Sequence, residues 1–213
     1  MIVTRKTGYY VFSLLLVLLC LTINTKARAN TKSMLILGDS LSAAYGMTLE
    51  QGWVSLTEQH YRDNNKPLYL INASISGETS AGALRRLPDL LAEHPVDWLL
   101  IELGGNDGLQ GQAINSITDN LTAMVQLAKQ QGIQVAVMQI RIPPNYGKRY
   151  TTAFESLYKT LAEQQQINYL PFFIEDIATQ SELMQNDGIH PNQQAQALIS
   201  RRMQQQLLEL VQD

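Results

Sequence analysis

A serine near the amino-terminal end of the chain and a histidine near its carboxyl-terminal end could together form an activated nucleophile. Ser40 comes shortly after the apolar run Met34–Leu37, where a strand is expected to end, and His190 comes three residues after Asp187. A serine hydroxyl is a weak nucleophile until a base takes its proton, and imidazole titrates near neutral pH. These residue types therefore predict Ser40 as nucleophile, His190 as base and Asp187 as the carboxylate that orients the imidazole.

Attack by a serine on a carbonyl carbon places negative charge on the carbonyl oxygen, which needs hydrogen-bond donors that are already in position. Three candidate donors follow expected strands: the backbone N–H groups of Ser40 and Gly77 and the side-chain amide of Asn106. Glycine at position 77 would let the backbone approach a ligand without a Cβ. Asp39 and Asp107 are interpreted as structural carboxylates that brace these loops. The chain thus predicts an oxyanion hole beside the candidate nucleophile.

The elements that must position these residues alternate along the chain. Five short apolar runs are typical of strands that are buried on both faces. These runs are Met34–Leu37, Leu68–Ile71, Trp98–Leu103, Ile133–Ile140 and Tyr169–Phe173. Between and after them, apolar residues recur at helical spacing over Trp53–Tyr61, Leu84–Leu91, Ile117–Leu127, Phe154–Leu161 and Ala197–Val211. The alternation predicts an α/β fold, a three-layer α/β/α sandwich around a five-stranded parallel sheet. Ligands bind at the carboxyl ends of such strands, so the candidate loops are expected to meet at one edge.

The first 29 residues have the layout of a secretory signal peptide. Arg5 and Lys6 precede the apolar run Val11–Ile23, and small residues follow it up to Ala29. The run is too short to span a bilayer comfortably, so we expect export and cleavage after Ala29. An uncleaved membrane anchor is the alternative. A lipoprotein signal would have to use Cys20, which lies inside the apolar run.

Residues 30–213 have the length of one domain with its own core. Four of the 16 Lys and Arg residues, and none of the 19 Asp and Glu residues, lie within residues 1–29, so residues 30–213 carry a net charge of −7. An acidic chain without a basic run argues against a nucleic-acid partner. The one cysteine, Cys20, would be removed with the signal peptide, and no two histidines have metal-ligand spacing. We therefore expect neither a disulfide nor a metal site.

Four sequence blocks carry a resemblance to a known family. They are Gly38–Leu41, Gly77, Gly105–Asp107 and Asp187–Pro191. Each block alone is a weak signal, but the four in this order and spacing resemble the SGNH hydrolases, the GDSL esterase/lipase superfamily. The residues around the four blocks are most similar to those of a bacterial periplasmic branch of this family with thioesterase and lysophospholipase activity. The similarity runs over nearly all of residues 34–211.

The resemblance implies a flavodoxin-like strand order, 2-1-3-4-5. It makes Ser40, His190 and Asp187 the catalytic residues, and it makes Ser40, Gly77 and Asn106 the oxyanion hole. It implies hydrolysis of acyl esters and thioesters, including fatty acyl-CoA and lysophospholipids, without a cofactor, in the periplasm of a Gram-negative bacterium. The nucleophile elbow Gly-x-Ser-x-Gly of the α/β-hydrolases is absent, so that fold is the wrong comparison.

Two further segments are predicted to shape an acyl site. Gly108–Gln112 has glycines near both ends, which suits a mobile flap, and Arg141–Gly147 mixes apolar and aromatic residues. An apolar groove between them would hold an acyl chain, since each buried methylene contributes about 0.8 kcal/mol. Leu109, Ile142 and Tyr146 are therefore the candidate substrate-binding residues.

Two alternatives remain open from the sequence. One is a carbohydrate O-acetylesterase of the same fold, and the other is a catalytically silent lipid-binding protein of the cell envelope. In either case we expect a monomer, a small-molecule ligand and at most peripheral contact with a membrane. An exported enzyme would not meet acyl-CoA, which is cytoplasmic, so lysophospholipid or another envelope ester is the more plausible natural substrate.

Overall fold

The computed structural model describes residues 31–212, of which residues 32–212 belong to one compact unit. The predicted signal peptide, with Cys20 and the expected cleavage point after Ala29, lies outside the described residues. No helix within residues 31–212 is both long and apolar enough to cross a membrane.

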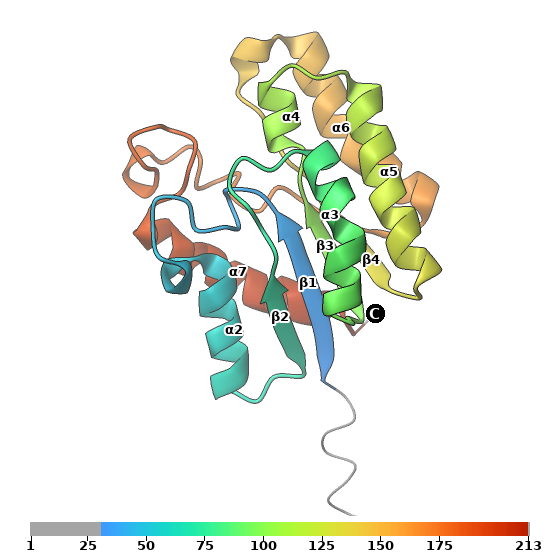
Figure 1. Cartoon of the computed structure of the whole chain (residues 1–213). Helices are drawn as coiled ribbons and strands as arrows, with labels where there is room; N and C mark the ends of the chain where they lie inside the picture. Colours follow the sequence, from blue (N-terminus) through green and yellow to red (C-terminus); the bar gives the residue numbers. More distant parts are fainter. Residues whose placement is uncertain (1–30, 213) are drawn as a thin grey trace, which may run out of the picture. The chain divides into compact units, whose positions relative to one another are not determined.

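A five-stranded sheet forms the centre of the fold. Its strands are β1 (Lys32–Gly38), β2 (Leu68–Asn72), β3 (Trp98–Glu102), β4 (Gln134–Met138) and β5 (Asn168–Leu170). All neighbouring pairs are parallel, and the order is β2-β1-β3-β4-β5. This confirms the predicted fold class and strand order. Figure 1 shows β1 and β3 side by side in the sheet, so the loops after both strands open at the same edge.

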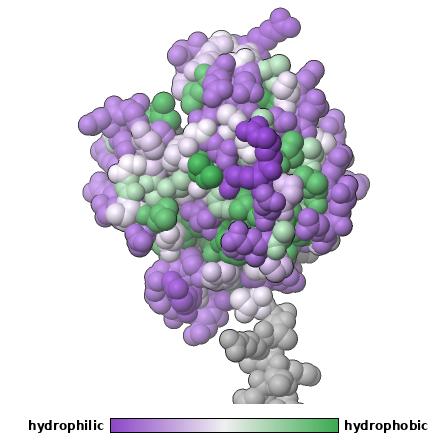
Figure 2. Space-filling view, in the orientation of Figure 1, coloured by the Kyte–Doolittle hydropathy of each residue, from purple (hydrophilic) through white to green (hydrophobic). Residues whose placement is uncertain are grey.

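Helices cover both faces of the sheet. One layer contains α3 (Ser80–Glu93), α5 (Ile114–Gln130) and α6 (Lys148–Gln165), and the other contains α2 (Trp53–Asp63) and α7 (Gln193–Leu210), as Figure 1 shows. The chain also forms the short helix α4 (Gly105–Leu109) and three 3-10 turns, η1 (Leu49–Gln51), η2 (Pro144–Tyr146) and η3 (Ser181–Leu183). In the orientation of Figure 2, hydrophilic residues cover most of the outer surface, with smaller hydrophobic patches between them.

The two-residue period of β1 explains why both helical layers pack against one strand. Leu35 and Leu37 belong to the core on the α3–α5–α6 side, and Met34 and Ile36 belong to the core on the α2–α7 side. All four side chains are fully buried. A strand of this kind reads as a continuous apolar run because neither of its faces meets water.

The structure shortens three of the predicted strands. β3 ends at Glu102 and β4 at Met138, both before the end of the apolar run. β5 ends at Leu170, because Pro171 has no N–H to continue the ladder. Phe173 leaves the sheet and packs against Trp53 of α2, with ring centroids 5.6 Å apart. Apolar character therefore located the strands, but tertiary packing set their ends.

Candidate active site

Ser40 lies in a tight turn just after β1. The backbone carbonyl of Asp39 accepts hydrogen bonds from the N–H groups of Ser42 and Ala43, and the Asp39 carboxylate accepts one from the N–H of Leu41 at 3.1 Å. Asp39 thus braces the turn, as the sequence predicted. These bonds hold the predicted nucleophile where the strand meets the loop.

The structure brings Ser40, His190 and Asp187 into one chain of hydrogen bonds. His190 Nε2 lies 2.8 Å from Ser40 Oγ, and His190 Nδ1 lies 2.7 Å from Asp187 Oδ2. Nδ1 faces a carboxylate and therefore carries the ring proton when the imidazole is neutral, which leaves Nε2 free to accept from the hydroxyl. An arrangement of this kind can take a proton from serine as the oxygen attacks.

Asp187 is held as an ion by its own loop. Burial raises its pKa, but this is outweighed by hydrogen bonds from the backbone N–H and the ring of His190 and from the N–H of Ile189, which lower the pKa to about 2. Asp187 Oδ1 accepts the two backbone bonds at 2.9 and 3.0 Å. One carboxylate therefore both shapes the loop before α7 and faces the imidazole.

Two residues that the sequence did not single out hold the His190 loop against the Ser40 side of the site. The Tyr45 ring lies over the imidazole of His190, with ring centroids 4.2 Å apart and planes inclined by 30°. Gln185 Nε2 donates to the carbonyls of Tyr45 at 2.8 Å and Pro191 at 3.2 Å. The contacts of Tyr45 with His190 and with Gln185 join segments that are far apart along the chain, so no local pattern could have found them.

The predicted oxyanion donors lie in three loops around the Ser40 turn. Among residues 31–212, no acceptor is bonded to the backbone N–H of Ser40 or of Gly77. Gly77 has a φ of +80°, and a Cβ added there would meet nothing within 4 Å. The positive φ favours glycine at this position, and the space beside its Cα is free of other atoms of residues 31–212.

Asn106 comes from α4, directly after β3. Its Nδ2 donates to the carbonyl of Glu78 at 2.9 Å and to Asp39 Oδ2 at 3.2 Å. The first bond fixes the amide beside the Gly77 loop. The second is long and joins a neighbouring carboxylate, so this hydrogen is the one that a developing oxyanion could take over.

A cavity of about 470 Å³ adjoins these groups. Ser40, Asn106 and His190 lie on its wall. Most of the remaining wall is apolar and includes Leu109, Ile140, Ile142, Phe172, Ile174 and Ile189. Two of the three candidate substrate-binding residues, Leu109 and Ile142, therefore line the cavity. The third, Tyr146, lies outside the lining, and its hydroxyl donates to the carbonyl of Leu109 at 2.8 Å.

The segment expected to be a flap from Gly108 is instead partly helical. Gly108 is a buried residue of α4, and a Cβ added there would lie 2.8 Å from Phe154 and 2.9 Å from Ile142. The glycine therefore allows α4 to pack closely against α6 and the cavity wall. The glycine spacing was correctly noticed but wrongly interpreted, because close packing and loop freedom both select glycine.

Two charged side chains on the cavity wall are already paired with each other. Arg141 forms ion pairs with Glu175 and with Glu155, the latter at 3.7 Å. Arg141 and Glu175 both contribute to the cavity wall. The cavity thus offers a ligand mainly apolar surface.

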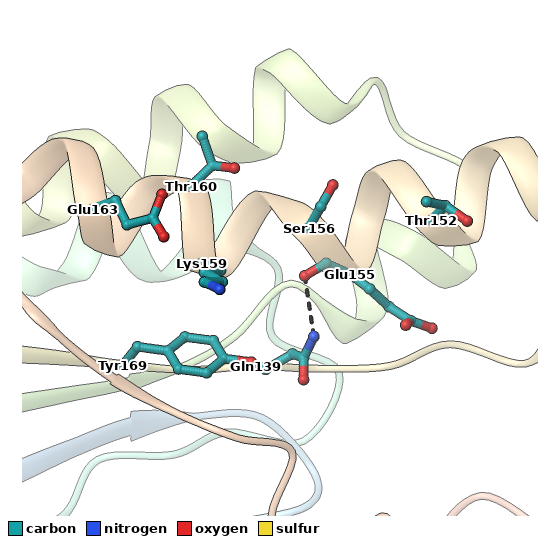
Figure 3. A pocket seen from close by; sticks show the side chains of 8 residues that line it. All are labelled: Gln139, Thr152, Glu155, Ser156, Lys159, Thr160, Glu163 and Tyr169. Atoms are coloured by element: carbon teal, nitrogen blue, oxygen red, sulfur yellow. Dashed lines mark hydrogen bonds between the residues drawn. The ribbon is translucent and has the colours of Figure 1, made fainter.

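A second depression lies between α6 and β5, as Figure 3 shows. It has a volume of about 520 Å³, and polar side chains such as Glu155, Lys159 and Glu163 line it. The Gln139 amide donates to the carbonyl of Glu155 there, at 3.2 Å. None of the predicted site residues reaches this groove, so size alone does not locate the site. Within the described part of the chain, no group of three or more His, Cys, Asp or Glu side chains is arranged to hold a metal ion.

Known proteins resemble this chain over most of its length. Residues 36–198 match the GDSL-like lipase/acylhydrolase family. An arylesterase from Vibrio mimicus is 45% identical over 195 residues, which cover 92% of this chain and 96% of the relative. The thioesterase 1/protease 1/lysophospholipase L1 of Escherichia coli K12 is 42% identical over 193 residues, 91% of either chain.

A solved structure extends the likeness to three dimensions. The psychrotrophic esterase EstA from Pseudoalteromonas sp., inhibited by monoethylphosphonate, superposes with a TM-score of 0.84 at 46% identity. The match covers 85% of this chain and all of EstA. The chain therefore belongs to the GDSL-like lipase/acylhydrolase family, the SGNH hydrolases, and is a serine esterase.

Proposed function

We propose that the protein hydrolyses acyl esters and thioesters through an acyl-enzyme formed on Ser40, with His190 as base and Asp187 as its orienting carboxylate. The observation that carries this proposal is the unbroken path from the Ser40 hydroxyl through both ring nitrogens of His190 to Asp187. It lies at the wall of an apolar cavity.

In the first half of the reaction, Ser40 Oγ bonds to the acyl carbon while its proton passes to His190 Nε2. The electron pair of the C=O bond moves to the carbonyl oxygen, which is bound by the N–H groups of Ser40 and Gly77 and the amide of Asn106. His190 then returns the proton to the leaving oxygen or sulfur as the bond to the acyl carbon breaks. An alcohol or thiol departs, and the acyl group stays on Ser40.

In the second half, water repeats the sequence. His190 takes a proton from water as its oxygen attacks the acyl carbon, and the Ser40 oxygen leaves with that proton. The carboxylic acid is released and the enzyme returns to its starting state. Apart from the substrate and water, each step uses backbone and side-chain groups of the chain itself.

The substrate class follows from the cavity wall. Apolar side chains and an already paired Arg141 suit an acyl chain, each buried methylene of which contributes about 0.8 kcal/mol. A volume of about 470 Å³ exceeds what an acetyl group needs, which disfavours the carbohydrate O-acetylesterase. The names of the relatives support esters, thioesters and lysophospholipids as substrates. We further propose export by residues 1–29 and action on envelope esters by a monomeric single domain, residues 30–213.

The decisive test compares Ser40→Ala with Ser116→Ala, a control serine that is exposed on α5. The purified proteins are assayed on p-nitrophenyl esters of increasing chain length, acyl-CoA, lysophosphatidylcholine and acetylated xylan, and labelled with a fluorophosphonate. We expect Ser40→Ala to lose turnover and labelling on every substrate while its unfolding transition is unchanged, and Ser116→Ala to keep both. Turnover by Ser40→Ala at the wild-type rate would refute the proposal.

A further inference from the structure

Glu102 is a fully buried acidic residue beneath the Ser40 turn, and the reaction described above does not use it. It is the last residue of β3 and lies opposite Gly38 in the register of β1. Its Oε2 accepts a hydrogen bond from Ser42 Oγ at 2.7 Å. The carboxyl group therefore contacts the Ser40 turn without being part of the cavity lining.

The Glu102 carboxyl group occupies the space that a side chain at position 38 would fill. A Cβ added to Gly38 would lie 2.5 Å from Glu102 Oε2 and 2.8 Å from Ser74 Oγ. Glycine at position 38 is thus the condition for this close approach. The strand end, the Ser42 hydroxyl and the Glu102 carboxyl group form one packed unit under the predicted nucleophile.

The surroundings of Glu102 disfavour a negative charge. Asp39 and Asp107 are nearby carboxyl groups that are 3% and 0% exposed, and the buried Tyr158 hydroxyl donates to the Leu103 carbonyl at 3.0 Å. In the described part of the chain, no Lys or Arg forms an ion pair with any of these carboxyl groups. His190, which acts electrostatically on Asp39, is already paired with Asp187.

Burial and the charge of Asp39 raise the pKa of Glu102 well above its usual value, and hydrogen bonding from Ser42 and from the Asp39 N–H opposes this only partly. Burial also raises the pKa of Asp39, to about 6. Two adjacent buried carboxyl groups do not both ionise readily, because the charge of one opposes the charge of the other. Glu102 is the more deeply buried of the two.

We propose that Glu102 is a positioning residue, a buried carboxylic acid that keeps its proton at neutral pH and anchors the Gly38–Ser42 turn so that the Ser40 hydroxyl stays in line with His190. The proposal rests on the proposed role of Ser40. A neutral acid gives the turn a polar anchor without placing a second negative charge next to the site where the oxyanion develops. An ionised Glu102 would oppose that charge through a medium that screens it poorly.

The test compares Glu102→Gln, which mimics the protonated acid, with Glu102→Ala, which removes the anchor. On a p-nitrophenyl ester at pH 7, we expect Glu102→Gln to keep kcat within about threefold of wild type, the scale of one net hydrogen bond. Glu102→Ala should lower kcat by up to the order of 10²-fold through misplacement of Ser40, with a much smaller change in KM. Equal loss of kcat in both variants would overturn the proposal, because it would mean that the ionised carboxylate is needed.

A second readout does not depend on catalysis and also covers the case in which Glu102→Ala fails to fold. A raised folded-state pKa means that the folded protein keeps a proton that the unfolded chain releases above about pH 4.5, so wild-type stability falls relative to Glu102→Gln as pH rises from there. Urea unfolding of the two proteins from acid to neutral pH should show this growing advantage for Glu102→Gln. A constant or shrinking difference would refute the protonated state.

The same comparison in an Asp39→Asn background isolates the contribution of the neighbouring charge. The stability difference between the two proteins should depend less on pH there, because burial and the charge of Asp39 are the two causes that raise the pKa of Glu102. An unchanged dependence would remove Asp39 from the explanation. If Ser40→Ala keeps its turnover, the proposed function fails, whereas these unfolding measurements still report on Glu102 itself.

Discussion

Asp187, which faces His190, and Asp39, which lies in the Ser40 turn, are the same residue type in opposite environments. The Asp187 side chain is 37% exposed and its pKa is lowered to about 2, while Asp39 is 3% exposed and its pKa is raised to about 6. Asp187 accepts two backbone N–H bonds and faces an imidazole. Asp39 has fewer donors and two acidic neighbours, Glu102 and Asp107.

The site therefore has two parts, a rim and a floor, which are stabilised by different interactions. The rim, which is the loop Asp187–His190, lies partly in water and depends on a few hydrogen bonds that end on one carboxylate. The floor, which is the buried group Asp39, Glu102 and Asp107, is fixed by packing and by polar contacts out of reach of water. We therefore expect substitutions at the rim to act mainly on activity, and loss of the Asp107 carboxylate at the floor to act mainly on stability.

The largest effects should come from the rim. His190→Ala should lower kcat by roughly 10⁶-fold, and Asp187→Ala by about 10⁴-fold, because a poorly oriented imidazole can still accept a proton. The unfolding transition should stay close to wild type in His190→Ala and fall only modestly in Asp187→Ala, since the rim is partly exposed. Steady-state kinetics and urea unfolding on the same preparations check this. A large loss of stability in Asp187→Ala would break the distinction between rim and floor.

At the floor, Asp107→Ala should act mainly on stability. Asp107 is fully buried and accepts from the Ser80 N–H at 2.8 Å and the Ser80 hydroxyl at 2.6 Å, where α3 begins. Removing it leaves buried donors without a partner, at about 1–3 kcal/mol of unfolding free energy. Denaturant unfolding measures the loss, with Asp119→Ala on the exposed face of α5 as the matched control. Equal stability of the two variants would contradict the assignment of Asp107 as a brace.

The smallest effect, and the sharpest in sign, is the dependence of stability on pH. Because its folded-state pKa is lowered, Asp187 stabilises the fold above pH 3.8 and loses that contribution as the pH falls toward about 2. Asp39, with its pKa raised to about 6, makes folding less favourable as the pH rises from 3.8 to about 6. Relative to wild type, Asp187→Asn should therefore lose stability with rising pH in the first window, and Asp39→Asn should gain it in the second. Slopes of the same sign would show that environment does not distinguish the two carboxylates.

Individual helices show which features of the fold the sequence alone could predict. Helical spacing in the sequence begins at Leu84, whereas α3 begins at Ser80, where the Thr79 hydroxyl caps it by accepting from the N–H of Gly82. Ser80 turns instead into the protein and bonds to Asp107. Apolar periodicity found every long helix within residues 31–212, because one face of each must be buried. It missed α4, because five residues are too few to show a period.

Local chemistry alone settled which residues could react. A serine after a buried strand, an Asp and a His three residues apart, and a glycine and an amide in the loops between are recognisable without coordinates, since reactivity depends first on residue type and spacing. The same holds for the parallel sheet, because strands buried on both faces leave a continuous apolar run.

Folding decided how those residues behave. The placement of Tyr45 over His190, the bond from Gln185 to Tyr45, the pairing of Arg141 with Glu175 and the raised pKa of Asp39 arise between segments brought together from distant parts of the chain, or from burial. Burial and long-range contact depend on the whole packed chain, so they cannot be read from the residues on either side.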